Sequence, residues 1–243
     1  MDFIITIFNE TLYRPLFSLL VWVYNVIPGQ DLGVAIIVVT VFLRVVLYPL
    51  SHKALKSQRA LQELQPKIKE IQQKVKNKQE KAKVLMEFYK KNKVNPFSGC
   101  LPLLIQLPIL IGLYRVFLTG LNPESLEVLY PFIQNPGELN HMFLGMINLA
   151  QPNHIFAVLA GLSQFLQSKA TYQQKSNPEK SNPGASSTPD FSKIMSQQMI
   201  YMMPLVMIFI TWSLPAGLAL YWIVTMIFSL GQQLVVNKSW KVL

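Results

Sequence analysis

The stretch GVAIIVVTVFLRVVLYPL at residues 33–50 decides the fold class, because Arg44 is its only charged residue. Its length approaches the roughly 20 apolar residues that cross a bilayer as an α-helix. An arginine inside such a helix costs about 3 kcal/mol or more unless it faces protein or water. Arg44 could also extend toward the helix end near Ser51, about 10 Å away at 1.5 Å per residue. We therefore predict a membrane helix whose arginine faces protein or a hydrated space, with this extension as the alternative.

The composition of the whole chain also favours a membrane protein. Apolar residues make up 51 % of the 243 residues and charged residues 14 %, against roughly 25 % charged residues in soluble proteins. We predict an all-α membrane protein with five transmembrane helices, an N-terminal interfacial helix and a cytoplasmic helical hairpin. The predicted spans are residues 32–51, 97–119, 147–168, 199–213 and 216–237.

The segments outside these spans have distinct patterns. Residues 1–31 carry apolar residues at helical spacing before Pro15, without a basic start or a cleavage site typical of a signal peptide. We predict an external interfacial amphipathic helix there, with a sixth span as the alternative. The remaining segments are a basic cytoplasmic hairpin, an external loop, a flexible cytoplasmic loop and a short cytoplasmic tail, at residues 52–96, 120–146, 169–198 and 238–243.

The distribution of lysine and arginine predicts the orientation. The hairpin, the loop after the third span and the tail hold 13, 4 and 2 basic residues, which is 19 of the chain's 22. Only Arg14 lies in a segment on the other side, while Arg44 and Arg115 fall inside spans. We therefore expect the C-terminus in the cytoplasm and the N-terminus outside.

The hairpin, His52 to Asn95, combines a helical seam with a high positive charge. Leucine, isoleucine and valine recur at three- and four-residue spacing up to Val75, a polar break follows at Asn77, and Pro66 marks a helix start or a kink. The segment contains 13 basic residues and only four acidic ones. A solvated surface would explain this charge, and so would attraction to anionic lipid headgroups or to ribosomal RNA.

Enzymatic motifs are missing from the sequence. None of the three histidines belongs to an HExxH zinc motif, and the chain has no GxSxG elbow and no Gly-rich phosphate loop. The single cysteine, Cys100, lies in an apolar run and suits packing. We therefore expect no enzymatic activity, no cofactor and no metal.

Polar residues recur inside the predicted spans at the depth of Arg44. Thr40 lies one helical turn from Arg44 on the same face. Each of these residues alone could form an interhelical hydrogen bond, but together they predict a hydrophilic groove open to the cytoplasm. The candidate groove residues are Arg44, Thr40, Gln106, Gln164, Trp222, Thr225 and Ser229.

Three motifs resemble the YidC family of membrane protein insertases. They are NPFSGCLPLLIQLP at residues 95–108, LQELQPKI at residues 61–68 and PAGLALYW at residues 215–222. Arg44, shortly before Tyr48-Pro49-Leu50, matches the family's groove arginine, and Thr40 and Trp222 match groove positions. The likeness extends over essentially the whole chain in order.

The resemblance implies five core spans around a groove that is open to cytoplasm and lipid, and a mobile cytoplasmic hairpin. It implies an insertase and chaperone of the bacterial inner membrane that receives hydrophilic segments of nascent membrane proteins without nucleotide hydrolysis, with Arg44 attracting acidic residues. The expected partners are nascent membrane proteins, lipids and, through the hairpin, the ribosome and the Sec translocon, with the chain acting as a monomer. Unlike some members of that family, this chain is expected to have no large periplasmic domain, no lipoprotein cysteine and no basic C-terminal extension. A small solute transporter or channel is the alternative function.

Overall fold

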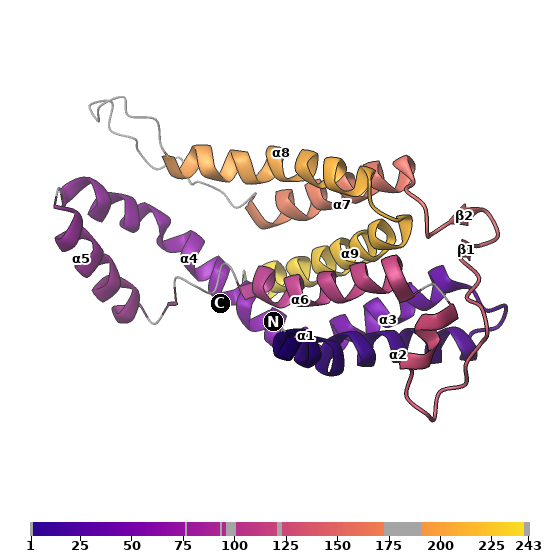
Figure 1. Cartoon of the computed structure of the whole chain (residues 1–243). Coiled ribbons are helices and arrows are strands. Elements are labelled where there is room, and N and C mark those ends of the chain that lie inside the picture. Colours follow the sequence, from indigo (N-terminus) through magenta and orange to yellow (C-terminus); the bar gives the residue numbers. More distant parts are fainter. Residues whose placement is uncertain are drawn as a thin grey trace.

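The computed structural model describes residues 2–75, 77–92, 94–95, 101–120, 123–172 and 191–240. Helices dominate this part of the chain, which confirms the predicted helical class, and one two-stranded antiparallel sheet is the exception (Figure 1). The elements are α1 (Asp2–Phe8), η1 (Asn9–Tyr13), α2 (Arg14–Val26), α3 (Leu32–Val46), α4 (Tyr48–Lys74), α5 (Lys78–Lys91), α6 (Leu101–Arg115), η3 (Val116–Gly120), η4 (Pro123–Val128), β1 (Met142–Phe143), β2 (Ile147–Asn148), α7 (His154–Tyr172), α8 (Phe191–Trp212) and α9 (Ala216–Trp240).

The N-terminal segment folds as helix from Asp2 to Val26, with one π-helical stretch, η1, between α1 and α2. One face of α2 is buried, and it includes Phe17, Val21 and Tyr24. α2 packs along α3, while Gly112 of α6 leaves room for the Leu16 side chain. The segment is thus joined to the bundle through an apolar face. Whether it lies in the membrane interface or crosses the membrane as an additional span is not tested by these contacts, so both stay predictions.

The predicted first span is divided between two helices. Asp31 caps α3, because its Oδ1 accepts a hydrogen bond from the Val34 amide at 3.0 Å. α3 ends at Val46, and after Leu47 the chain continues as α4 with a bend of 65° between the two helices. Proline is tolerated in the first turn of a helix, where its missing N–H has no intrahelical partner, and Pro49 lies in that turn of α4.

The hairpin helices α4 and α5 project away from the bundle, and α8 lies apart from them in the same view (Figure 1). The chain turns between Lys74 and Lys78, at the polar break seen in the sequence. Pro66 lies inside α4, so the helix does not begin there. Only the base of α4 is buried against the bundle, through Ala54, Leu55 and Arg59.

α7 packs between α8 and α9. The third span was predicted from residue 147, but Ile147 lies in β2, and α7 begins at His154 after Asn153 accepts hydrogen bonds from the Ile155 and Phe156 amides. At the same end of the bundle, the amides of Ala216 and Gly217 donate to carbonyl groups of residues 151 and 149. These bonds fix the start of α9 beside the start of α7.

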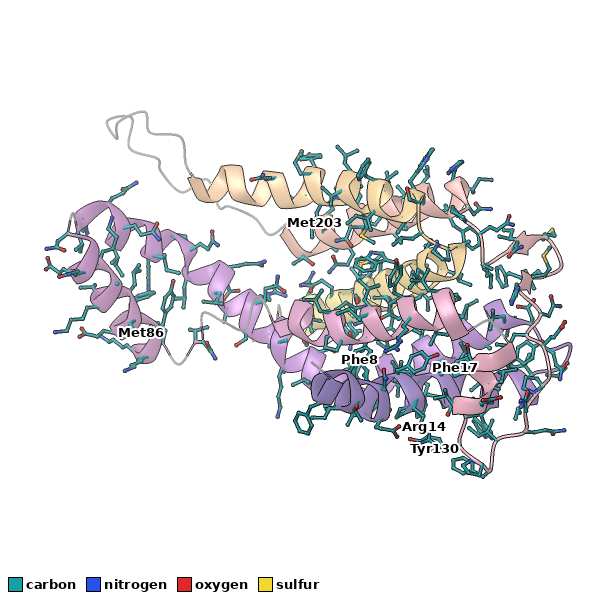
Figure 2. The ribbon with its side chains drawn as sticks, viewed as in Figure 1. Phe8, Arg14, Phe17, Met86, Tyr130 and Met203 are labelled. Carbon is teal, nitrogen blue, oxygen red and sulfur yellow. The ribbon has the colours of Figure 1, made fainter. Side chains whose placement is uncertain are left out.

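Much of the bundle surface is apolar, as expected for helices that face lipid. Figure 2 shows Met203 on this surface of α8. Exposed apolar residues on α3, α6, η3, α7, α8 and α9 include Val41, Phe42, Val45, Ile111, Leu118, Val158, Leu162, Leu205, Phe209, Ile227 and Leu234. By length and composition, one described helix, Ala216–Ser239, can cross a membrane alone, and the bent pair α3 and α4 passes the same test together. Gln106–Leu118 and Ile200–Trp212 are shorter apolar helices.

Candidate functional site

Arg44 lies in the last turn of α3, one turn before the bend into α4. Its side chain is partly buried, and its Nη2 donates a hydrogen bond of 2.8 Å to Oε1 of Gln106 on α6. The two residues are 62 positions apart in the chain. The bend therefore keeps the guanidinium between two helices, so Arg44 faces protein as the sequence predicted.

Tyr221 of α9 extends this contact to a third helix. Nε2 of Gln106 donates to the Tyr221 hydroxyl, and Tyr221 is 2 % exposed. Thr225 follows one turn later on α9 and is fully buried. We call Arg44, Gln106 and Tyr221 the Arg44 cluster. It joins α3, α6 and α9 through side chains that carry a single charge.

A second polar contact lies on the neighbouring residue of α9. The Trp222 indole Nε1 donates to Oε1 of Gln164 on α7 at 3.2 Å, and the Gln164 amide donates to Ser168 at 3.3 Å. Tyr221 and Trp222 are adjacent, so α9 connects the Arg44 cluster on one side with α7 on the other. We call Trp222, Gln164 and Ser168 the Gln164 cluster.

Three candidate groove residues take no part in either cluster, namely Thr40, Ser229 and the buried Thr225. The Thr40 hydroxyl donates to the Ile36 carbonyl of its own helix at 2.6 Å, and the residue is 3 % exposed. Ser229 is half-buried on α9, and no hydrogen bond of its hydroxyl is described within residues 191–240. The structure thus brings Arg44, Gln106, Gln164 and Trp222 into polar contacts between helices, whereas Thr40 is satisfied locally.

No acidic side chain neutralises Arg44 in the part of the chain that the structure describes. The ion pairs there involve Arg14 with Glu10, Arg59 with Glu63 and Lys74 with Glu70. Arg14 also lies over the Tyr130 ring, 4.7 Å from its centroid, at the surface (Figure 2). Arg44 therefore keeps a net positive charge beside neutral amide and phenol groups.

Tyr221 was missed by the sequence reasoning although it belongs to the motif at residues 215–222. A tyrosine in an apolar run suits ordinary packing, and only the approach of Gln106, 115 positions away, gives its hydroxyl a polar partner. The signal that could have found it is the general need of a buried tyrosine hydroxyl for a hydrogen bond.

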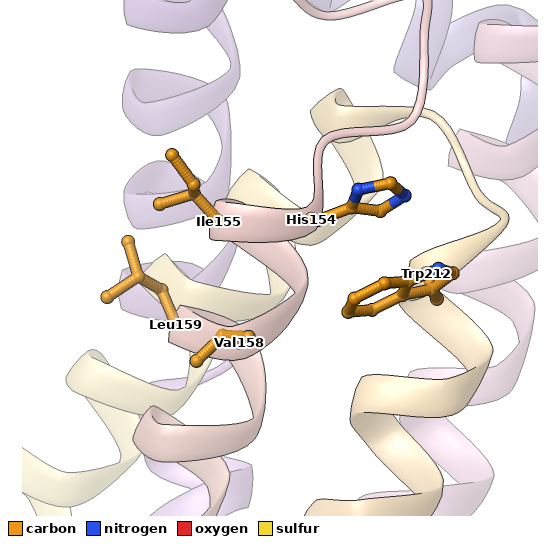
Figure 3. Close-up of a pocket in the computed structure, with 5 residues that line it drawn as sticks. All are labelled: His154, Ile155, Val158, Leu159 and Trp212. Carbon is orange, nitrogen blue, oxygen red and sulfur yellow. The ribbon is translucent and has the colours of Figure 1, made fainter.

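A surface cavity of about 330 Å³ lies elsewhere, between the start of α7 and the end of α8 (Figure 3). It is lined by Ile155, Val158 and Leu159, and by His154, whose ring stacks on Trp212 with centroids 4.1 Å apart. It contains no predicted groove residue and lies at the end of the bundle opposite the hairpin (Figure 1). Its wall is mostly apolar, which distinguishes this cavity from the polar Arg44 cluster.

The fold and the site define a helical membrane protein in which Arg44 lies between helices with no acidic partner among the described residues. Residues 22–242 match the family model described as 60Kd inner membrane protein. The chain is 35 % identical to the Membrane protein insertase YidC of Oceanobacillus iheyensis over 225 residues, which cover 89 % of this chain and 80 % of that protein. It belongs to this family of inner membrane proteins, the YidC insertases.

Longer members of the family match over only part of their length. The Membrane protein insertase YidC of Wolinella succinogenes is 35 % identical over 93 % of this chain, but the match covers 37 % of that protein. The crystal structure titled "Active YidC insertase crystal structure with the first transmembrane domain resolved" superimposes with a TM-score of 0.56 at 23 % identity, over 92 % of this chain and 45 % of that one. This likeness extends to the fold alone.

Proposed function

We propose that the chain inserts other proteins into the membrane by receiving their hydrophilic segments at the Arg44 cluster. The observation that carries the proposal is the charge of Arg44, which has amide and phenol neighbours but no carboxylate in the described residues. A charge held in a poorly hydrated site attracts an opposite charge more strongly than it would in water. An acidic residue of a translocating segment is the partner that this site lacks.

The proposed architecture has five spans around a hydrophilic groove that opens to the cytoplasm. The distribution of basic residues supports an N-terminus outside and a C-terminus in the cytoplasm. The two clusters support the groove, because they put polar side chains of α3, α6, α7 and α9 at one level of the bundle. Apolar helices of the substrate would leave toward lipid along the exposed apolar surface.

The proposed mechanism needs no nucleotide. The main cost of moving a short polar segment across the bilayer is the loss of its hydrogen bonds to water. Side chains such as Gln106 and Gln164 can donate and accept hydrogen bonds, and they lower this cost before the segment reaches the far side. The apolar helix that follows supplies the favourable free energy when it enters lipid.

The hairpin is the proposed contact for cytoplasmic partners. Exposed lysines on α4 and α5 include Lys67, Lys74, Lys83, Lys90 and Lys91. Their charge supports binding to anionic lipid or ribosomal RNA, and a contact with the Sec translocon is proposed on the same surface. We expect a monomer to be sufficient for insertion.

Proteoliposomes that contain only the purified protein test the proposal. The substrates are two single-span proteins that differ in one residue of the translocated tail, aspartate or asparagine. We expect Arg44→Ala to slow insertion of the aspartate form by about 5- to 30-fold, the effect of losing about 1 to 2 kcal/mol of attraction, and Arg44→Lys to retain most of the rate. Equal rates for wild type and Arg44→Ala on both substrates would contradict the role of Arg44, and ion flux without insertion would support a channel.

A further inference from the structure

The base of the hairpin is attached to the bundle by a buried arginine. Arg59 of α4 is 5 % exposed, and its Nη1 donates to Oδ1 of Asn237 on α9 at 3.0 Å and to the Val236 carbonyl at 3.4 Å. The Glu63 carboxylate lies 3.9 Å from its Nε. Burial lowers the pKa of the Arg59 guanidinium and the nearby Glu63 raises it, but arginine stays protonated in proteins.

Asn237 connects this contact to two further helical positions. Its Oδ1 also accepts a hydrogen bond of 3.0 Å from Gln233 one turn earlier on α9. Its Nδ2 donates to the Ala170 carbonyl near the end of α7, at 3.5 Å. One amide side chain thus joins Arg59 of α4 to the ends of α9 and α7, which are cytoplasmic on the predicted orientation.

α7 and α9 are also the two helices joined by the Gln164 cluster. Ala170 lies six residues from Gln164, about 9 Å along α7, and Asn237 lies fifteen residues from Trp222, about 22 Å along α9. A helix transmits a shift of one end to the other because its backbone hydrogen bonds are stiff compared with side-chain contacts. The hairpin and the polar site are therefore connected by rigid elements.

We propose that Arg59 is a positioning residue, which clamps the hairpin to Asn237 and so couples the hairpin's position to the Gln164 cluster. The functional part of this proposal rests on the proposed insertase function. A partner that binds the projecting hairpin would pull on this clamp, since the described residues of α4 and α5 that are buried lie at the base of α4. If Arg59 and Asn237 separated, the ends of α7 and α9 would be free to move, and the two helices carry the Gln164 cluster.

A role in packing alone fits the geometry of the buried Arg59 less well than a clamp. Arg59 donates to a side-chain amide and a backbone carbonyl of one helix end, which is a fixed set of protein acceptors. Packing alone would be satisfied by an apolar residue, and burying a guanidinium costs free energy unless its hydrogen bonds are made. Nη1 donates to both acceptors on α9 while Nε lies toward Glu63, so the guanidinium uses two different nitrogens, whereas a lysine ammonium has only one.

Spin labels test the clamp independently of insertion. A protein with Cys100→Ser carries labels at Glu80→Cys on α5 and Gln198→Cys on α8, both exposed in the structure. We expect Arg59→Ala to broaden the distance distribution between the labels, and Asn237→Asp to narrow it by adding an opposite charge to Arg59. Glu87→Ala, which removes an exposed charge from α5, is the matched control and should leave the distribution unchanged. Equal distributions for Arg59→Ala and wild type would overturn the clamp.

Tryptophan fluorescence tests the coupling to the site. Trp222 remains as the single tryptophan when phenylalanine replaces the other three. We expect Arg59→Ala and Asn237→Ala each to shift the wavelength of Trp222 emission. The double variant should show no larger shift than either single variant, because both substitutions remove the same contact. Unchanged emission in a correctly folded Arg59→Ala protein would overturn the coupling even if insertion were normal.

Insertion assays then separate this inference from the proposed function. We expect Arg59→Ala to slow insertion on the order of fivefold or more, the usual range for coupled sites, for substrates with aspartate and with asparagine alike. Arg59→Lys should restore only part of the rate. A loss confined to the aspartate substrate would make Arg59 a substrate contact and overturn the positioning role, while absence of insertion by wild type would refute the function and leave both spectroscopic tests valid.

Discussion

Reversal of the charge at residue 44 should reverse the preference of the site. In Arg44→Glu, Gln106 can turn its amide so that Nε2 donates to the new carboxylate, while Oε1 accepts from the Tyr221 hydroxyl. The Arg44 cluster can therefore keep two hydrogen bonds with the charge inverted, because an amide and a phenol each donate and accept. We expect the variant to fold and to favour translocated segments that carry lysine.

The magnitude follows from the position of the side chain. Two unit charges about 4 Å apart interact by about 1 kcal/mol in water and by about 4 kcal/mol at an effective dielectric constant of 20. Arg44 is partly exposed, so we take about 1 to 2 kcal/mol for each attraction or repulsion. Exchange of attraction for repulsion then changes the free energy by about 2 to 4 kcal/mol, or at least about 30-fold in rate.

The assay measures initial insertion rates into proteoliposomes for three substrates whose translocated tails carry aspartate, asparagine or lysine. No membrane potential is applied, because about 2.3 kcal/mol per charge at 100 mV would mask the effect. Wild type should follow the order aspartate, asparagine, lysine, and Arg44→Glu the opposite order. Lys67→Glu on the exposed hairpin face makes the same change in net charge and should keep the wild-type order. An unchanged order in Arg44→Glu would refute the electrostatic reasoning.

Three further predictions concern packing and capping. Gly161→Ala should lower the thermal midpoint of unfolding in detergent, because the new Cβ would lie 2.2 Å from Ile208 and 3.1 Å from a backbone oxygen of α8. Gly231→Ala is the control, since its Cβ meets nothing within 4 Å, and it should raise the midpoint because alanine favours helix over glycine. Asp31→Ala should cost about 1 to 2 kcal/mol in unfolding experiments through loss of the α3 cap, and Asp31→Asn should cost less. Trp222→Phe and Gln164→Ala should each lower the thermal midpoint, and the double variant should fall short of their sum, since both remove one hydrogen bond.

Sequence patterns predicted the helical class and several helix positions because these depend on local composition. The fifth predicted span begins at residue 216, as α9 does. The third span was placed too early, since the apolar run from Ile147 includes a β-strand and an Asn153 cap that hydropathy does not distinguish from helix. The continuous helix α4 was also not foreseen, because its bend from α3 at Leu47 depends on packing.

The candidate site could be predicted in part. Arg44 stood out because a charge inside an apolar helix is costly, and glutamines in other spans were visible for the same reason. Tyr221 and Arg59 were not visible as polar contacts. Arg59 is one of 13 basic residues in the hairpin segment, and only its approach to Asn237, 178 positions away, distinguishes it from the others.

On the proposed function, the neutral partners of Arg44 would let one charge serve many substrates. An acidic partner inside the bundle would form a buried ion pair, and an incoming carboxylate would then have to displace it at a cost of several kcal/mol. Gln106 orients the guanidinium by a single hydrogen bond without cancelling its charge. On that proposal, guanidinium donors that are not engaged by Gln106 or Tyr221 bind the substrate carboxylate, and the Gln106 amide turns back after the segment has passed. Orientation by an amide therefore favours transient binding, which the proposed function requires because every substrate must be released.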